Sequence, residues 1–345
     1  MPDHGPRLAD HTTLRLGGSA RAWVRATTED ALVEAVANAD QAGEPVLVLA
    51  GGSNLVVADE GFDGTVVEVA TTGVQVDHEG ADPTCGGVLV TAAAGESWDA
   101  LVARAVDSGW VGMEALSGIP GSLGATPIQN VGAYGQEVSQ TLASVRVWDR
   151  RLRGVRTFAA ADCGFGYRTS RFKADPGRHV VLEATFQLRQ GDLAAPVAYA
   201  ELARTLGVAP GERPPMADVR GAVLELRRSK GMVLDPDDHD TWSAGSFFTN
   251  PVVAAEELPE GAPSWPQADG RSKTSAAWLI EHAGFGRGYG EGAARLSGKH
   301  TLALTNRGSA TTTALLALAR EIRDGVESRF AIRLVPEPVL VGCEL

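Results

Sequence analysis

The sequence has 345 residues, of which 44% are hydrophobic and 21% are charged, a composition typical of a globular protein with about two domains. Its net charge of −12 disfavours nucleic acid or an anionic membrane as the main partner, although local arginines can still bind a small anion. No stretch has the length and apolarity of a membrane span, and the polar start MPDHGPRLADH lacks a signal-peptide core, so a cytoplasmic protein without a membrane partner is expected.

The first third of the chain is predicted to alternate strands with helices. Helices capped by Thr28 and Ser97 are expected to end near Gln41 and Ser108, each just before a glycine. Short apolar or alternating runs between turn residues predict strands at 20–26, 45–50, 65–69, 74–77 and 88–94.

Residues 118–137, GIPGSLGATPIQNVGAYGQE, are too rich in glycine and proline for a regular helix or strand. The apolar residues between the glycines, such as Leu123 and Ile128, indicate that the segment is packed. Such a loop is either a buried structural connection or a wall that presents backbone N–H groups to a flat, anionic cofactor. The segment alone favours neither interpretation.

The rest of the chain contains a candidate domain boundary near residues 191–196, where the composition changes. Strands are predicted before it at 144–149, 155–158 and 179–188. Beyond it, the pattern predicts helices at 197–206, 216–230, 274–282 (capped by Thr274) and 310–330. A polar loop is expected at 231–244 and a surface excursion at 256–272. A strand is predicted at 301–306, and a closing β pair is predicted between 332–335 and 339–343.

The common nucleotide-binding fingerprints fail in this sequence. No G-x-x-x-x-G-K-[ST] motif occurs, and residues 288–293 fit G-x-G-x-x-A only after a predicted helix, so no Rossmann site is predicted. The GGSN segment at 51–54 is better placed, because it follows an apolar strand, where open sheets usually bind ligands. It is either a plain turn or, with residues 118–137, the second glycine-rich wall of an elongated cofactor site.

Three further segments combine polar groups with a constrained backbone. Residues 167–173, YRTSRFK, carry arginines that can pair with a carboxylate or phosphate, although a solvated basic turn has the same composition. Ser246, in GSFFTNP, is either a hydroxyl in an apolar pocket or a capping serine, and no G-x-S-x-G frame supports a hydrolase. Glu337 lies between two prolines, which either fix its direction at a site or form an exposed turn.

Neither the cysteines nor the histidines show the spacing of a metal site. Cys85, Cys163 and Cys343 lie far apart, which predicts free thiols, as in a cytoplasmic protein. The seven histidines include no pair at ligand spacing, so no metal is predicted.

Taken in order, AGGSN, GIPGSLGATPIQNVGAYGQE, YRTSRFK, GSFFTNP and PEP resemble the UDP-N-acetylenolpyruvoylglucosamine reductase family, from about His11 to Gly342. The resemblance implies an α+β fold, with a two-subdomain FAD-binding domain of the vanillyl-alcohol-oxidase (PCMH) type at 14–191. An α+β substrate-binding domain would follow at 192–345, with its C-terminal segment returning to the flavin site. The implied activity is that of an NADPH-dependent flavoenzyme of peptidoglycan precursor synthesis, which reduces the enolpyruvyl ether of UDP-N-acetylglucosamine enolpyruvate to UDP-N-acetylmuramate. A monomer is expected.

The resemblance also implies roles for individual residues. Arg168, Ser246 and Glu337 would be catalytic, with Ser246 as the proton donor, and Tyr199 resembles a tyrosine that closes over the uridine end of the substrate in the form of the enzyme with an extra loop. The implied substrate-binding residues are Tyr167, Arg168, Tyr199, Arg227, Lys230, Ser246, Asn250 and Glu337. The implied cofactor-binding residues are Gly51, Gly52, Ser53, Asn54, Gly118, Ile119, Pro120, Gly121, Gly124, Ala125, Gln129, Asn130, Gly132, Ala133 and Tyr134.

Two positions depart from the family's pattern: Thr249 stands where lysine is frequent, and Ala50 replaces the first of three glycines. FAD is expected to be bound non-covalently, because residues 118–137 include no histidine and Cys85 lies outside both glycine-rich segments. Two alternatives stay open. One is another non-covalent FAD oxidoreductase of the same fold that acts on a sugar or hydroxy acid, and the other is a non-catalytic protein that binds flavin or a nucleotide sugar.

Overall fold

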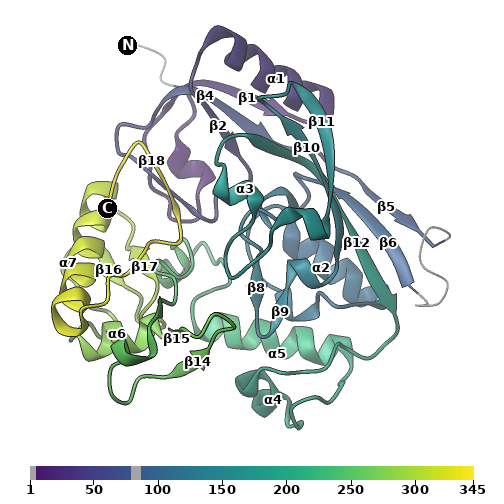
Figure 1. Ribbon diagram of the computed structural model, residues 1–345. Helices are drawn as coiled ribbons and strands as arrows, with labels where there is room; N and C mark the ends of the chain where they lie inside the picture. The colour runs from purple at the N-terminus through teal and green to yellow at the C-terminus, as the bar shows by residue number, and fades with distance from the viewer. Residues whose placement is uncertain (1–4, 79–86) are drawn as a thin grey trace. The chain divides into compact units, whose positions relative to one another are not determined.

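A computed structural model describes residues 5–78 and 87–345, so the prediction for Cys85 lies outside the described residues. The chain forms two compact units (Figure 1). The sheet unit consists of Ala22–Gly51 and Gly64–Arg228, and the α7 unit consists of the chain up to Arg21, Gly52–Asp63 and Ser229–Leu345. Within the described residues, no helix is long and apolar enough to cross a membrane.

The sheet unit begins with a small three-stranded sheet and one helix. Strands β1 (Ala20–Ala26), β4 (Phe62–Val69) and β2 (Val46–Leu49) lie in the order β1-β4-β2, and β2 and β4 run parallel. Helix α1 (Glu29–Ala42) begins as predicted, because the Thr28 side chain accepts a hydrogen bond from the backbone of Ala31. It ends at Gly43, which adopts the left-handed conformation that favours glycine.

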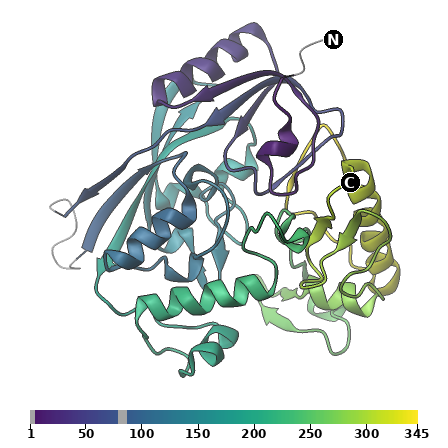
Figure 2. The same ribbon diagram turned by 180° about the vertical axis from the view of Figure 1, so that it is seen from behind.

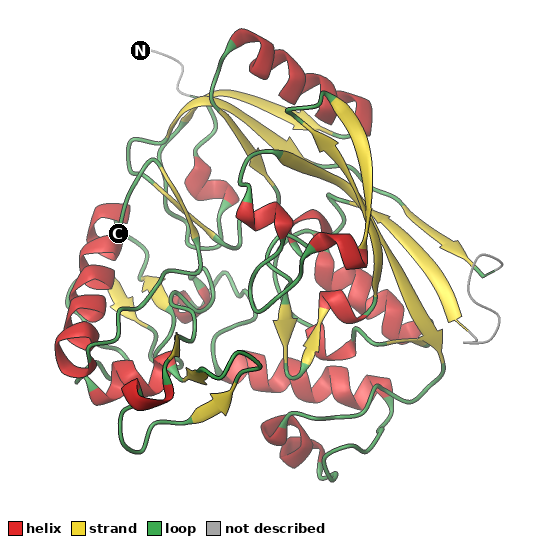
Figure 3. Ribbon diagram, viewed as in Figure 1, coloured by secondary structure: helices red, strands yellow, loops and turns green. Residues whose placement is uncertain are grey.

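A larger antiparallel sheet forms the centre of this unit (Figure 3). Its order is β11-β10-β12-β6-β5, and the short β7 pairs with the end of β12. The bounds of these strands are β5 Val74–Asp77, β6 Gly87–Ala93, β7 Trp110–Val111, β10 Leu142–Asp149, β11 Gly154–Ala159 and β12 His179–Gln190.

The core of this unit lies between the larger sheet and helix α2 (Trp98–Asp107), which Ser97 caps as predicted. Trp98 of α2 and Phe186 of β12 are both fully buried, with their ring centroids 6.0 Å apart. The alternation predicted for β12 is observed, because Ala184, Phe186 and Leu188 are buried while the residues between them are partly exposed. Short elements join β7 to β12: η2 Glu114–Leu116, η3 Leu123–Ala125, β8 Gly132–Ala133, β9 Gln136–Glu137, η4 Val138–Gln140, η5 Ala160–Cys163 and α3 Arg171–Ala174.

Two helices complete the sheet unit, and Figures 1 and 2 show them side by side. They are α4 (Ala200–Leu206) and α5 (Met216–Ser229), and they share a small apolar cluster. The predicted start of α4 at residue 197 is wrong by three residues. Val197 is extended and exchanges backbone hydrogen bonds with the turn at 211–212, so it cannot join the helix.

The α7 unit is built around α7 (Thr312–Phe330), whose apolar face packs with α6 (Ala276–His282) and the two fully buried rings of Phe247 and Phe248. Its other elements are η1 Leu8–His11, β3 Leu55–Val57, η6 His239–Thr241, β13 Val252–Val253, η7 Ala255–Glu257, β14 Ser264–Pro266, β15 Ser272–Thr274, β16 Ala294–Leu296, β17 Leu304–Asn306 and β18 Val339–Val341.

Two predictions for the α7 unit are wrong in detail. The closing β pair does not form, because β18 pairs in parallel with β3 and residues 332–335 contain no strand. Helix α6 is capped by Ser275, whose side chain accepts from the backbone of Trp278, and Thr274 instead ends β15. The surface excursion predicted at 256–272 is largely exposed, as expected, and within it β14 pairs with β15.

Candidate functional site

The glycine-rich segment 118–137 lies wholly in the sheet unit, and it is packed, as predicted. Leu123 is fully buried, and its backbone N–H and that of Gly124 donate to Glu96 and Ala94, each at 2.8 Å. At the start of the segment, the N–H of Gly118 donates to the carboxylate of Asp99 at 2.6 Å. The segment is therefore held by the unit's own backbone at several points.

The two predicted glycine-rich walls contact each other directly. A Cβ atom on Gly51 would lie 2.5 Å from the Cα atom of Gly121, so only glycine allows the two backbones to approach this closely. Gly52 has a φ of +61°, and a Cβ there would lie 1.9 Å from the carbonyl oxygen of His11. Gly51 belongs to the sheet unit, whereas Gly52, Ser53 and Asn54 belong to the α7 unit.

The basic run at 167–173 divides its side chains between different tasks. Ser170 caps α3 by accepting from the backbone of Phe172 and Lys173. The guanidinium of Arg171 stacks on the ring of Phe158 at 3.9 Å, and the Lys173 ammonium donates to the carbonyl oxygen of Arg168 at 3.0 Å. Most of the run is therefore structural, and it fixes the backbone at Arg168.

Two members of this run contact the glycine-rich segment: Ser170, whose Oγ atom donates to the carbonyl oxygen of Ile128, and Arg168. The Nη2 atom of Arg168 donates to the carbonyl oxygen of Gly132 at 2.8 Å, and its backbone adopts a φ of +53°, which is uncommon for a residue other than glycine. Asn130 ties the same region together, because its Nδ2 atom donates to Glu137 at 2.8 Å and to the Gly166 carbonyl at 3.2 Å. The structure thus brings the predicted Arg168 to the predicted residues Asn130 and Gly132.

Tyr134 and Tyr199, predicted separately, contact each other in the sheet unit. Their rings meet edge to face with centroids 5.4 Å apart. Burial raises the pKa of Tyr134 to about 12, although the nearby charge of Arg227 lowers it. Burial likewise lowers the pKa of Arg227, although the charges of Tyr134 and Asp99 raise it. Arg227 therefore places a half-buried positive charge near Tyr134.

Two buried or half-buried carboxylates that hold these segments were not predicted. Burial raises the pKa of Asp99, but the Arg220 guanidinium and the Gly118 N–H outweigh that effect, so its pKa is lowered. Glu114 is fully buried and accepts from the backbone N–H groups of Gly112 and Ala195. The signal for Glu114 was an acidic residue inside the apolar run WVGMEAL.

In the α7 unit, the backbone brings the predicted Ser246, Glu337 and Asn54 into one region. The N–H of Glu337 donates to the carbonyl of Phe247 at 2.8 Å, next to Ser246 in the chain. The N–H of Val339 donates to the carbonyl of Asn54 at 2.9 Å, and the Asn54 side chain donates to the Glu337 carbonyl at 3.4 Å. Three predicted motifs that are distant in sequence therefore meet here.

The remaining predicted residues of the α7 unit have structural contacts. The Asn250 side-chain oxygen accepts from the backbone of Ala276, at the start of α6. Thr249, at the position where the resemblance implies a frequent lysine, donates through its backbone to the Val335 carbonyl at 3.1 Å. Lys230 directly follows the end of α5. Of the three predicted catalytic residues, Ser246 and Glu337 lie in the α7 unit and Arg168 lies in the sheet unit.

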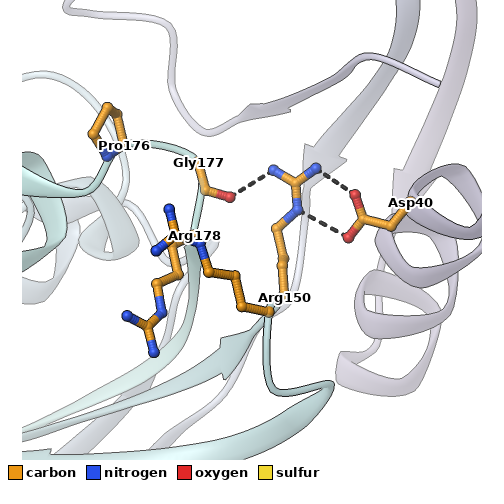
Figure 4. A pocket seen from close by; sticks show the side chains of 6 residues that line it. Asp40, Arg150, Pro176, Gly177 and Arg178 are labelled. Atoms are coloured by element: carbon orange, nitrogen blue, oxygen red, sulfur yellow. Dashed lines mark hydrogen bonds and ion pairs between the residues drawn. The ribbon is translucent and has the colours of Figure 1, made fainter. Parts of the chain in front are cut away.

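A surface pocket of 340 Å³ elsewhere in the sheet unit contains no predicted site residue (Figure 4). It is lined by Asp40, Arg150, Arg151, Pro176, Gly177 and Arg178. The dashed lines in Figure 4 mark the bonds from Arg150 to the Asp40 carboxylate and to the Gly177 carbonyl. Arg178 and Arg151 likewise pair with Asp149 and Asp175, so the charges that line the pocket are compensated. We interpret it as a structural ion-pair network.

Comparison with known proteins gives two family matches within the chain. Residues 20–153 match the family model of an FAD binding domain, and residues 235–341 match that of the C-terminal domain of UDP-N-acetylenolpyruvoylglucosamine reductase.

Full-length relatives carry the same name. The UDP-N-acetylenolpyruvoylglucosamine reductase of Cutibacterium acnes is 57% identical to this chain, over 98% of this chain and 90% of the relative. The enzyme of the same name from Saccharopolyspora erythraea is also 57% identical, over 100% of this chain and 97% of the relative. The crystal structure of UDP-N-acetylenolpyruvylglucosamine reductase from Thermus caldophilus is similar with a TM-score of 0.63 at 25% identity, over 97% of both chains.

Proposed function

The chain belongs to the UDP-N-acetylenolpyruvoylglucosamine reductase family, and we propose that Arg168, Ser246 and Glu337 carry its reaction. As a member of this family it is an FAD-containing oxidoreductase that uses NADPH to reduce the enolpyruvyl ether of UDP-N-acetylglucosamine enolpyruvate, forming UDP-N-acetylmuramate for peptidoglycan synthesis. The predicted family, the α+β fold class with its FAD-binding domain, and the cofactors are thereby confirmed.

The glycine-rich segments are the proposed FAD site, and their residues fit such a group. Residues 118–136 contain no charged side chain, so no carboxylate there would repel a pyrophosphate. The half-buried charge of Arg227 and the guanidinium of Arg168 lie beside this segment and favour an anion. We assign FAD binding to the cofactor residues predicted between Gly51 and Asn54 and between Gly118 and Tyr134. When bound, FAD supplies the hydride that it has taken from NADPH.

Arg168 is suited to hold the carboxylate of the enolpyruvyl group. As the terminal carbon of the enol ether gains hydride, negative charge develops across the α-carbon and the carboxylate. A guanidinium that is already oriented stabilises this charge without reorganisation in the transition state. The bonds from Arg168 to Gly132 and from Lys173 to Arg168 supply that orientation.

Ser246 is the proposed donor of the proton that the α-carbon takes up. A serine hydroxyl is a weak acid, but a carbanion next to a carboxylate is basic enough to accept its proton. Glu337 is proposed to stabilise the enolic form of the substrate carboxylate. The observation that carries this assignment is the backbone pairing of Phe247 with Glu337, which brings the Ser246 and Glu337 motifs together in one unit.

The remaining predicted substrate contacts are part of the same proposal. We assign Tyr167, Tyr199, Arg227, Lys230 and Asn250 to binding of the sugar nucleotide. Tyr199 and Tyr167 are among the exposed large apolar side chains, 45% and 37% accessible, so both can reach a ligand. We also propose that the enzyme is a cytoplasmic monomer, which sedimentation of the purified protein and fractionation of its source cells can test.

The absorbance spectrum of the purified protein tests the proposed roles, beginning with Ser246. In the wild type, NADPH should bleach a flavin band, and the enolpyruvyl sugar nucleotide should restore it without oxygen. In Ser246→Ala, bleaching should proceed at the normal rate, while reoxidation by substrate should slow by about 10²–10³, as for other lost transition-state donors.

Ser264→Ala is the matched control, because Ser264 is exposed on β14 and should leave both half-reactions unchanged. An unchanged reoxidation rate in Ser246→Ala would exclude the proton-donor role. Flavin that stays attached to the denatured protein would contradict non-covalent binding.

A further inference from the structure

Glu114 is a fully buried carboxylate at the start of η2, outside the residues assigned above. Its Oε2 atom accepts from the N–H of Gly112 at 2.7 Å. Its Oε1 atom accepts from the side-chain amide of Gln136 at 2.9 Å and from the N–H of Ala195 at 2.6 Å. A buried carboxylate is costly unless hydrogen bonds satisfy it, and these three bonds do so.

All three partners of Glu114 are donors, which makes the choice of a carboxylate specific. An ionised carboxylate only accepts hydrogen bonds, whereas the amide of glutamine has one oxygen and two N–H groups. Glutamine at this position would therefore direct an N–H group at one of the three donors. Gln136 is fixed in the required orientation, because its own side-chain oxygen accepts from the N–H of Ala115 at 2.7 Å.

Two of these bonds, to Gln136 and Ala195, connect two segments that meet again at their far ends. Gln136 begins β9, and the turn of the β8–β9 hairpin carries Tyr134. Ala195 precedes the segment that leads to Tyr199. The two tyrosine rings contact each other, and a Cβ on Gly135 would lie 3.8 Å from the backbone nitrogen of Tyr199. Glu114 thus joins the hairpin and the Tyr199 segment at one end, while Tyr134 and Tyr199 join them at the other.

We infer that Glu114 is a positioning residue that sets the place of Tyr199 relative to the β8–β9 hairpin, and so acts on binding of the sugar nucleotide. This inference rests on the proposed function of Tyr199 in substrate binding. Glu114 itself touches neither the substrate nor the cofactor in this assignment. Its effect reaches the substrate through Ala195 and Tyr199.

A double-mutant cycle tests this inference with Glu114→Gln, Tyr199→Ala and the combination. Glu114→Gln should raise the KM for the enolpyruvyl sugar nucleotide about tenfold, the effect of about 1.4 kcal/mol of lost binding, and should leave the rate of flavin reduction at saturating NADPH unchanged. In the Tyr199→Ala background the same change should raise KM less than about twofold, because coupled residues are not additive. Glu225→Gln, an exposed carboxylate on α5, is the matched control and should change neither quantity.

Equal effects of Glu114→Gln in both backgrounds would overturn the inference, since Glu114 would then act without Tyr199. An unchanged KM in Tyr199→Ala alone would also overturn it, and would locate the error in the proposed function of Tyr199. If Glu114→Gln does not fold or hold FAD, Gln136→Met takes its place. It removes the hairpin bond of Glu114 and the bond from the Ala115 N–H to Gln136, and it keeps the bonds of Glu114 to Gly112 and Ala195. Gln136→Met should raise the KM for the enolpyruvyl sugar nucleotide in the wild-type background and raise it much less in the Tyr199→Ala background. Equal effects on KM in the two backgrounds would again contradict the inference.

Discussion

The backbone at Arg168 is strained in a way that fits its proposed role. A φ of +53° at a residue other than glycine costs on the order of 1–3 kcal/mol, and such residues cluster at functional sites. The surrounding contacts compensate for this cost, since Lys173 donates to the Arg168 carbonyl and Gly166 exchanges backbone hydrogen bonds with Thr169. A side chain held in this way is already oriented before the substrate binds.

We predict that Arg168→Lys lowers kcat by about 10² while FAD remains bound. The ammonium group of lysine cannot reproduce the planar fork of a guanidinium. It therefore cannot bond the Gly132 carbonyl and a carboxylate in the same geometry. Steady-state kinetics and the flavin absorbance of the purified variant measure the two quantities. Arg171→Lys is the matched control from the same run, because Arg171 stacks on Phe158 and donates to the Asp162 carbonyl. Comparable kcat losses in both variants would exclude a specific role for Arg168.

At the scale of elements, we predict that Gly52→Ala and Gly43→Ala differ strongly in stability although both glycines have positive φ. A Cβ on Gly43 meets nothing within 4 Å, so alanine there should cost about 1 kcal/mol, the penalty for the left-handed backbone. A Cβ on Gly52 would lie 1.9 Å from the backbone oxygen of His11, so alanine there should cost at least about 3 kcal/mol or prevent folding. Urea denaturation measures both values, and a difference below about 1 kcal/mol would contradict the assigned contact.

The elements that the sequence predicted well are those with local signals. The caps at Thr28 and Ser97 and the alternation in β12 depend on residues a few positions apart, and the structure confirms them. The parallel pairing of β18 with β3 joins residues nearly three hundred positions apart, and no local pattern encodes it. The cap of α6 was misassigned because Thr274 and Ser275 are adjacent and equally suited to capping.

The candidate site shows the same limit. The motifs containing Arg168, Ser246 and Glu337 could be found from their composition and from the family resemblance. The meeting of Asn54 with Glu337, and of Tyr134 with Tyr199, could not, because each depends on long-range backbone pairing or packing. Glu114 was missed since a single acidic residue in an apolar run gives no indication of its three donors.

At the scale of the whole molecule, the compact units differ in extent from the predicted domains at 14–191 and 192–345. The segment Gly52–Asp63 belongs with Ser229–Leu345, because β3 pairs with β18 and the carboxylate of Asp59 accepts from the backbone of Thr312 at 2.7 Å. The predicted division concerns function, and it stays a prediction. Of the residues proposed as catalytic, Arg168 lies in the sheet unit, and Ser246 and Glu337 lie in the α7 unit.

We expect the stability of the sheet unit to depend on pH through two buried side chains, Asp149 at the end of β10 and His179 at the start of β12. The Arg178 guanidinium lowers the pKa of Asp149 to about 2, so the stabilisation from this carboxylate is present above its unfolded value of about 3.9 and is lost as the pH falls toward 2. Burial lowers the pKa of His179, although the charge of Asp149 raises it. As the pH falls, the unfolded chain therefore takes up a proton on His179 at a higher pH than the folded chain does. The stabilisation that the folded state gains with a neutral His179 is accordingly lost as the pH falls below about 6.5.

We predict that His179→Phe flattens the dependence of stability on pH just below 6.5. The His179 ring already packs edge to face against Phe158 and Phe172, with centroids 5.6 Å away, and its Nδ1 atom has no hydrogen-bond partner among the residues described. Phenylalanine should therefore be accommodated, and the titrating group is removed. In the variant, the free energy of unfolding, measured by urea denaturation, should fall less steeply with decreasing pH than in the wild type. The difference between the two slopes should be at most about 1.4 kcal/mol per pH unit. Above pH 7 the two slopes should coincide, and equal slopes between pH 6.5 and 5 would show that His179 does not couple protonation to unfolding.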